Sequence, residues 1–179
     1  MLNESLIHHQ VRRGQGDGEI INYDVSSRKE AERKTCKVIY EHDALLSHEG
    51  TIPGKHLQKI KVVALIFAAQ WCPPCREFCS KLSELYAEKN SGSSKQLEVV
   101  FISGDYDEKA FNEYYSQMPW LALPYEDPDR EVIIDELDIG AIPEVFIITR
   151  NNVVVTRQGR TDVETLGVKA FDKWVSLSS

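Results

Sequence analysis

The segment KVVALIFAAQWCPPC, residues 61–75, decides the fold of this chain. It contains an unbroken apolar run, VVALIFAA at 62–69, and such a run is typical of a strand that is covered on both faces. Two prolines follow at 73 and 74, and the first turn of a helix tolerates proline because its amides lack helical partners. The segment therefore predicts a buried strand that leads directly into a helix, with Cys72 and Cys75 at the junction.

Strands and helices are expected to alternate after this junction. Apolar residues recur at helical spacing over 78–86 and again over 111–118, and the apolar run LEVVFIS at 97–103 predicts a second buried strand between them. Asp127 as N-cap and Pro128 at the first helical position predict a shorter helix near 128–138. This region therefore follows the order strand, helix, strand, helix, helix.

The C-terminal third predicts an antiparallel hairpin followed by a helix. EVFIIT (144–149) and VVVTR (153–157) flank a short polar connection that suits a hairpin, and apolar residues share one face of a predicted helix over 162–175. Upstream, CKVIY (36–40) predicts a short strand and EGTIPGKHLQKI (49–60) a turn-rich connection. The fold class is therefore α/β, with a central mixed β-sheet and helices on both faces.

Two parts of the chain differ in composition. Residues 1–34 hold few branched or aromatic side chains and are expected to form a flexible leader, whereas residues 35–179 form one domain. The neighbouring His8 and His9 have no further ligand types at a fixed spacing around them, so we interpret them as tail residues rather than as a metal site.

Composition and charge exclude several classes of protein. The 21 Lys and Arg against 28 Asp and Glu give a net charge of −7, which disfavours nucleic-acid binding. The longest apolar run is far shorter than the roughly 20 residues of a membrane span, so we expect no membrane partner. The N-terminus resembles neither a secretory signal nor a transit peptide, which predicts a cytoplasmic or nuclear protein.

The cysteine pair at 72 and 75 is the candidate reactive site. At the start of a helix, unpaired amides and the helix dipole favour a thiolate at Cys72, whereas Cys75, nearly one turn inside the helix, is expected to be shielded. Cys72 would attack a substrate disulfide, and Cys75 would then resolve the mixed disulfide. The alternative, half of a structural zinc site, lacks a second ligand pair, so no metal is predicted.

Four blocks carry a resemblance to a known family. FAAQWCPPC, the strand VVFIS, MPWLALPYEDP and AIPEVFII resemble the nucleoredoxin and tryparedoxin branch of the thioredoxin superfamily, and most closely the small nucleoredoxin-like proteins. The resemblance runs from about Cys36 to Val175. It implies a thioredoxin-like fold with one additional helix before a cis-proline.

The resemblance also implies which residues surround the substrate. It places Pro143 as the cis-proline opposite the cysteine pair, Ile142 as the backbone edge for the substrate chain, and Trp71, Pro73 and Pro74 at the binding surface. Read without the resemblance, Pro143 would simply start an edge strand and Trp71 would be core.

Three positions depart from the family pattern. Ile66 stands where many thioredoxins have a buried aspartate, so proton transfer must use water or another group. Glu144 follows the cis-proline, where threonine is usual, and a carboxylate close to Cys72 would raise the pKa of that thiol. Gly104 stands where tryparedoxins have tryptophan, which argues against trypanothione as reductant.

The remaining candidates have structural and functional interpretations. We expect Cys79 to pack in the core rather than to form a second disulfide, and Cys36 to act as a small apolar residue in its strand. Arg157 and Arg160 are interpreted as solvated surface, with a basic rim for an anionic thiol as the alternative.

The sequence thus predicts a thiol-disulfide oxidoreductase, a protein-disulfide reductase that needs no bound cofactor. Its partners would be disulfide-bearing proteins and an unidentified thiol or reductase that supplies electrons. The main alternative is a redox-sensitive interaction module with little turnover. A thiol peroxidase is the weaker third interpretation, because Ala69 stands where those enzymes carry threonine.

Overall fold

A computed structural model describes residues 25–151 and 153–178 and builds them around one seven-stranded sheet. The strand order is β2-β1-β5-β4-β3-β6-β7. The strands are β1 (Leu45–Ser47), β2 (Gly50–Ile52), β3 (Val62–Ala68), β4 (Leu97–Ser103), β5 (Leu121–Ala122), β6 (Glu144–Thr149) and β7 (Val153–Thr156). The strands β3, β4 and β5 are parallel, and the remaining neighbours pair antiparallel, so the sheet is mixed as expected.

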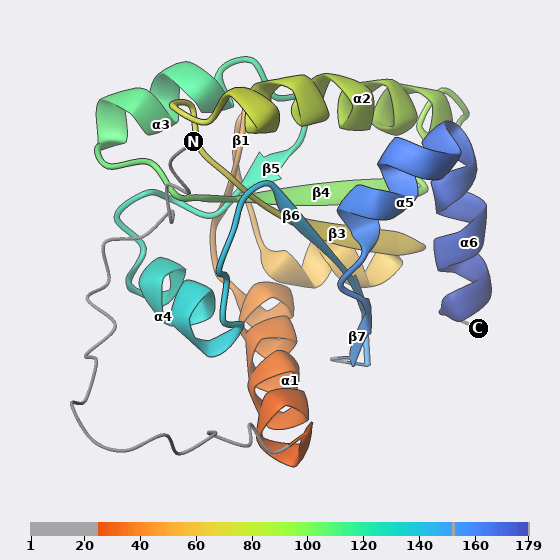
Figure 1. The fold of residues 1–179 in the computed structure, drawn as a ribbon, viewed down its shortest axis with the longest axis horizontal. Coiled ribbons are helices and arrows are strands. Elements are labelled where there is room, and N and C mark those ends of the chain that lie inside the picture. The colour runs from red at the N-terminus through yellow and green to blue at the C-terminus, as the bar shows by residue number, and fades with distance from the viewer. Residues whose placement is uncertain (1–24, 152, 179) are drawn as a thin grey trace, which may run out of the picture.

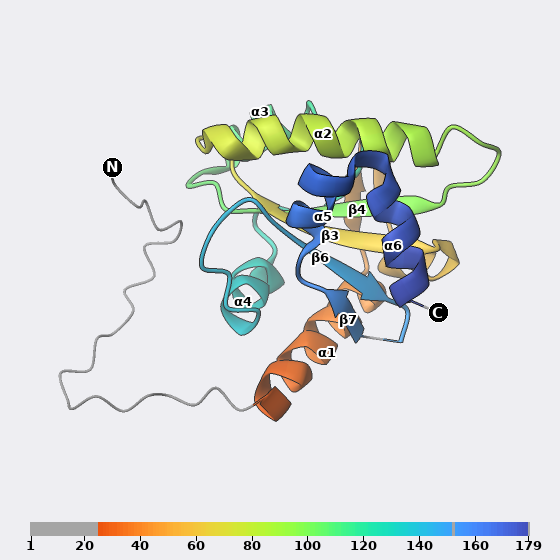
Figure 2. The ribbon, with the colours of Figure 1, turned by 45° about the vertical axis from the view of Figure 1, so that its right-hand side comes forward.

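Helices cover both faces of this sheet (Figure 1). The α-helices are α1 (Val25–Glu41), α2 (Pro73–Lys89), α3 (Glu108–Tyr115), α4 (Pro128–Glu136), α5 (Gly159–Leu166) and α6 (Ala170–Leu177), and the 3-10 helices are η1 (Gly54–Lys59) and η2 (Gly167–Lys169). Figure 1 shows α2 and α3 above the sheet and α1 and α4 below it, and Figure 2 shows α5 and α6 beside α2. The predicted architecture is confirmed.

The central strand β3 is apolar throughout because its side chains enter two separate cores. Residues 62, 64, 66 and 68 pack with α2, α3, α5 and α6, whereas residues 63, 65 and 67 pack with α1, η1 and α4. All seven residues of β3 are buried. Side chains alternate across a strand, so a continuous apolar run is what a sheet with two covered faces requires.

The elements nearest the predicted site form where the sequence places them. Strands β3 and β4 and the β6–β7 hairpin are confirmed, as is α2 beginning at Pro73. Helix α4 starts as predicted, because the Asp127 carboxylate accepts the amide of Asp129 at 2.9 Å and Pro128 opens the first turn.

The prediction of a strand over 36–40 is wrong. These residues belong to α1, in which the buried side chains Thr35, Cys36, Ile39 and Tyr40 recur at helical spacing. Cys36, Ile39 and Tyr40 pack in the core between the sheet and α1, η1 and α4, which we call the lower core. Five residues are too few to separate the two periodicities, and packing decided between them. Residues 25–34, assigned to the leader, are also helical, while residues 1–24, with His8 and His9, lie outside the described residues.

Two further elements differ from expectation. The single helix predicted over 162–175 is two helices, α5 and α6, because Gly167 has a φ of 56° and ends the first one, and Leu166 on the predicted apolar face is exposed. The turn-rich connection contains β2 and η1, and β5 was not predicted. Within the described ranges, no helix is long and apolar enough to cross a membrane.

Candidate active site

The cysteine pair lies where β3 ends and α2 begins. Cys72 is the N-cap of α2 in extended backbone, and Cys75 lies in the first turn. The two sulfur atoms are joined in a disulfide, with the Cα atoms 5.2 Å apart. The Cys75 amide donates to the Cys72 Sγ at 3.3 Å, so a helix N-terminal amide points at the sulfur that opens the helix.

The two cysteines differ in their access to solvent. Cys72 is 5 % exposed and Cys75 is 0 % exposed, so of the two residues only Cys72 borders the surface. The prolines between them, Pro73 and Pro74, are both exposed. The sequence-based assignment of an outer and an inner cysteine therefore agrees with the geometry.

The loop before β6 lies against the outer cysteine. The bond between Ile142 and Pro143 is cis, as the resemblance implies, and the Cys72 sulfur lies 3.9 Å from the carbonyl oxygen of Ile142. Ile142 is half-buried and Pro143 is buried. The structure thus brings together two segments that lie 70 residues apart in the chain.

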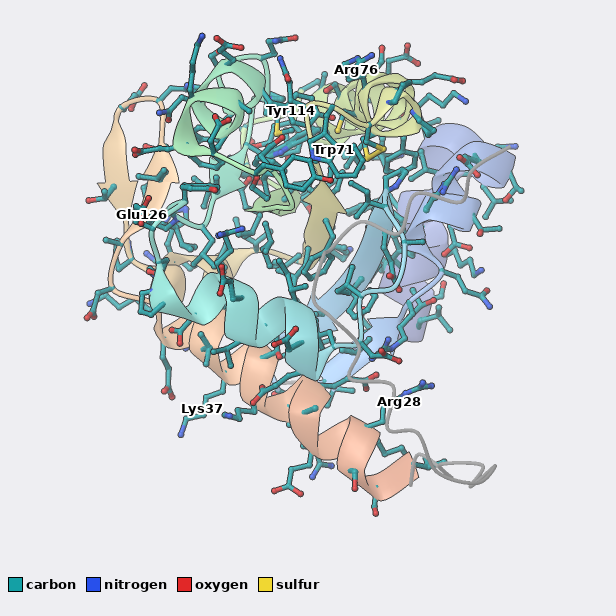
Figure 3. The ribbon with its side chains drawn as sticks, turned by 60° about the vertical axis from the view of Figure 1, so that its left-hand side comes forward. Arg28, Lys37, Trp71, Arg76, Tyr114 and Glu126 are labelled. Atoms are coloured by element: carbon teal, nitrogen blue, oxygen red, sulfur yellow. A yellow bond between two sulfur atoms is a disulfide. The ribbon has the colours of Figure 1, made fainter. Side chains whose placement is uncertain are left out.

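Trp71 borders the disulfide on the side of the β4–α3 loop (Figure 3). Its indole Nε1 donates to the carbonyl oxygen of Gly104 at 3.3 Å, and its ring stacks on Tyr106 with centroids 5.1 Å apart. The half-buried Trp71 therefore packs against the core above the sheet and also stacks on the exposed Tyr106.

The buried carboxylate of Asp105 anchors the turn that carries the cysteines. Its Oδ1 accepts the amide of Gln70 at 2.7 Å, and its Oδ2 accepts the hydroxyl of Ser103 at 2.8 Å. Burial raises the pKa of Asp105, and the two donors partly oppose the rise. Sequence reasoning missed this residue, although an aspartate just past a buried strand was the available signal.

Two of the residues that depart from the family pattern, Ile66 and Glu144, lie in different surroundings. Ile66 is fully buried in β3, opposite Phe101 of β4. Burial raises the pKa of the half-buried Glu144 carboxyl, and Arg157 opposes that rise. The effect of Glu144 on Cys72 stays a prediction.

The two arginines predicted as solvated surface are engaged in contacts. The Arg157 guanidinium donates to Glu32 at 2.8 Å and to the Leu137 carbonyl oxygen at 3.0 Å, and Arg160 donates to Glu164 at 3.0 Å. For Arg157 the solvated-surface interpretation is wrong, because the side chain ties the hairpin to α1 and α4.

The other two cysteines are buried and unpaired, as expected, although Cys36 is helical. Burial raises the pKa of Cys36 to about 12 and that of Cys79 to about 11. Cys79 lies at the wall of a cleft of about 270 Å³ between α2 and α3, where its sulfur accepts the Tyr114 hydroxyl at 3.1 Å. These thiols are protonated at neutral pH.

Three residues of types that can ligate a metal lie close together, but their histidine is already hydrogen-bonded within the protein. His42, Asp127 and Asp129 approach one another, but the His42 Nδ1 accepts the amide of Ala44 at 3.1 Å. Its other nitrogen, Nε2, therefore carries the proton and donates to Asp127 at 2.8 Å. The group ties the entry of β1 to α4.

Comparison with known proteins shows the family to which this fold and cysteine pair belong. The family model described as thioredoxin-like matches residues 59–154, and the chain belongs to that family. Within it, the relatives include nucleoredoxins and tryparedoxins, which confirms the resemblance to that branch.

The curated relatives are longer proteins. The chain is 40 % identical over 111 residues to probable nucleoredoxin 1 of Arabidopsis thaliana, a match that covers 62 % of this chain and 19 % of the relative. It is 42 % identical over 102 residues to nucleoredoxin of Xenopus laevis, covering 56 % of this chain and 24 % of the relative. The chain thus spans about a quarter or less of the length of these relatives.

The solved structures match most of their own length. Tryparedoxin from Trypanosoma brucei is 36 % identical with a TM-score of 0.67, covering 77 % of this chain and 95 % of that chain. Tryparedoxin II complexed with glutathionylspermidine is 32 % identical with a TM-score of 0.65, covering 73 % and 91 %.

Proposed function

We propose that the chain is a protein-disulfide reductase in which Cys72 is the nucleophile and Cys75 the resolving thiol. The observation that carries the proposal is the asymmetry of the pair, since Cys72 borders the surface and Cys75 is fully buried. The Cys75 amide directed at the Cys72 sulfur, together with the helix dipole, would stabilise a Cys72 thiolate in the reduced protein.

The reaction proceeds in two exchanges. The Cys72 thiolate attacks one sulfur of the substrate disulfide, which forms a mixed disulfide and releases the other substrate sulfur as a thiolate. Cys75 loses its proton and attacks the Cys72 sulfur, which releases the second substrate thiolate and leaves Cys72 and Cys75 joined. Two electrons pass from the protein to the substrate, and the two released thiolates take up protons.

The disulfide-bearing polypeptide lies along the loop of Ile142 and Pro143 in this proposal. The Ile142 carbonyl oxygen, 3.9 Å from the Cys72 sulfur, offers it a backbone acceptor, while Trp71, Pro73 and Pro74 supply the apolar surface. Two equivalents of an external thiol, or a reductase, return the pair to the dithiol. A solved tryparedoxin II is a complex with glutathionylspermidine, whereas Gly104, at the position where tryparedoxins have tryptophan, argues against a donor of that kind for this chain.

A second candidate is a redox-sensitive interaction module with little turnover. The half-buried Glu144 next to the cis-proline favours it, because a carboxylate at this loop would raise the pKa of the Cys72 thiol and slow its attack. Partner release on oxidation of the pair would then be the readout.

Dithiol-driven reduction of insulin tests the first candidate. We expect the native chain to accelerate reduction above the dithiol background, Cys72→Ser to abolish the acceleration, and Cys75→Ser to accumulate a mixed disulfide. Cys79→Ser is the matched control, because its thiol is buried on the same helix and outside the proposed reaction. A fully reduced native chain that adds nothing to the background rate refutes the reductase and leaves the interaction module.

A further inference from the structure

Tyr106 is a large aromatic residue that stays exposed next to Trp71, the residue that precedes Cys72. Its side chain is 68 % exposed, although its ring stacks on Trp71 with an interplanar angle of 12°. Because Trp71 covers one face of the ring, the other face is open to solvent. An open aromatic face next to a reactive centre is a surface that a bound substrate can cover.

The residues before and after Tyr106 in the chain are both anchored by hydrogen bonds. On one side Asp105 is buried and bonded to Gln70 and Ser103. On the other side the Asp107 carboxylate accepts the amide of Ala110 at 2.8 Å and caps α3. Tyr106 therefore connects two anchored residues, and little ordering entropy is lost when a ligand covers it.

Two acidic residues follow Tyr106 directly in the chain. Asp107 and Glu108 are exposed next to Tyr106, and among the described residues no basic side chain pairs with either of them. The next residue, Lys109, is exposed and lies 3.8 Å from Glu113. An exposed ring face followed in the chain by two exposed carboxylates without an ion-pair partner favours a cation with an apolar stem.

Two arginines near this loop are engaged by backbone carbonyl groups, and one of them, Arg130 of α4, donates to the carbonyl oxygens of Ser103 at 2.9 Å and Tyr125 at 2.8 Å. Arg76 of α2 donates through its guanidinium to the carbonyl oxygen of Gln70 (Figure 3). This hydrogen bond holds Arg76 at the turn before Trp71, so the arginine is not stacked on Tyr106.

We propose that the open face of Tyr106 takes an arginine or lysine side chain of the polypeptide substrate, close in sequence to the cysteine that Cys72 attacks. This inference rests on the proposed reductase function and names its substrate class as polypeptide disulfides flanked by basic residues. Tyr106 is then a specificity-determining residue, through a cation–π contact assisted by Asp107 and Glu108. A cation–π contact at an exposed site corresponds to roughly two- to fivefold in kcat/KM.

Matched disulfide peptides test the proposal. Three peptides that differ only in one residue near the cysteine, arginine, glutamine or leucine, are reduced by the native chain and by two variants. Tyr106→Phe keeps the ring face, whereas Tyr106→Leu keeps an apolar side chain without it. We expect the native chain and Tyr106→Phe to prefer the arginine peptide over both others by two- to fivefold, and Tyr106→Leu to show equal rates with arginine and glutamine.

Each opposite result overturns the inference. If the native chain reduces the arginine and glutamine peptides at equal rates, the inference is refuted while the reductase function stands. If Tyr106→Leu still prefers the arginine peptide, the selectivity comes from residues other than Tyr106. Faster reduction of the leucine peptide makes the occupant apolar rather than basic.

A binding measurement separates this inference from the reductase itself. Absence of turnover with all three peptides counts against the proposed function, so the oxidised native chain is also titrated with linear, cysteine-free versions of the peptides. The indole N–H of Trp71, followed by NMR, should shift at lower concentration of the arginine peptide than of the glutamine peptide. Identical titrations refute the basic-residue contact whatever the turnover.

Discussion

Replacing Asp105 with alanine measures how firmly the β4–α3 loop holds the cysteine turn. The substitution removes the acceptors of the Gln70 amide at 2.7 Å and of the Ser103 hydroxyl at 2.8 Å. A buried donor left without its partner costs about 1–3 kcal/mol, and removal of a buried carboxyl returns part of that loss. We therefore expect the free energy of unfolding to fall by about 2–4 kcal/mol, or about 5–15 °C in Tm.

Urea unfolding and insulin reduction are the assays. Asp105→Asn is the informative variant, because its amide oxygen can still accept from Gln70 and its amide nitrogen can donate to Ser103, so it should lose less than about 1.5 kcal/mol. Asp107→Asn is the control, since it removes a neighbouring exposed charge and keeps an oxygen that caps α3. Asp105→Ala with native stability and native insulin reduction would refute the anchoring role.

The pH dependence of Asp105 has a defined sign. Burial raises the pKa of Asp105 above its ordinary value of 3.8, so the folded state binds the proton more tightly than the unfolded state. The wild-type free energy of unfolding therefore loses a contribution as pH rises from about 4 through the folded pKa. Asp105→Asn lacks this contribution, so the stability of wild type relative to the variant should decline over that window. A difference that rises with pH would contradict the burial of this carboxyl.

Two further substitutions test contacts that position the fold. Gly54→Ala places a Cβ against the backbone carbonyl oxygen of Ile39, and we expect thermal unfolding to show a loss of about 3 kcal/mol or more, whereas Gly140→Ala, with open space around its Cβ, should stay within about 0.5 kcal/mol of wild type. Asp162→Ala leaves the buried indole N–H of Trp174, now bonded at 2.9 Å, without an acceptor, and urea unfolding should show a loss of about 1–3 kcal/mol. Asp162→Asn should recover much of that loss, and a variant as unstable as Asp162→Ala would show that the Trp174 bond is not the cause.

Long apolar runs and helix caps were predictable from the sequence because they act locally. The run over 62–69 and the prolines at 73 and 74 fix β3 and the start of α2 whatever surrounds them, and Asp127 with Pro128 does the same for α4. The pentapeptide 36–40 has no such local determinant. It is helical because the buried side chains of α1 meet the lower core at helical spacing, a contact that lies outside any short window.

The sequence by itself determined the chemistry of the site, since two cysteines three residues apart at a helix start set which sulfur is outer and which is inner. Only the tertiary structure decided what surrounds that pair. Asp105 bonds Gln70, Gly104 accepts from Trp71, and Ile142 of the cis-proline loop lies against Cys72, from positions 33 to 70 residues away. The physical reason is that helix spacing and capping depend on neighbours within one turn, whereas hydrogen bonding and stacking between strands depend on which chain ends the sheet brings to one edge.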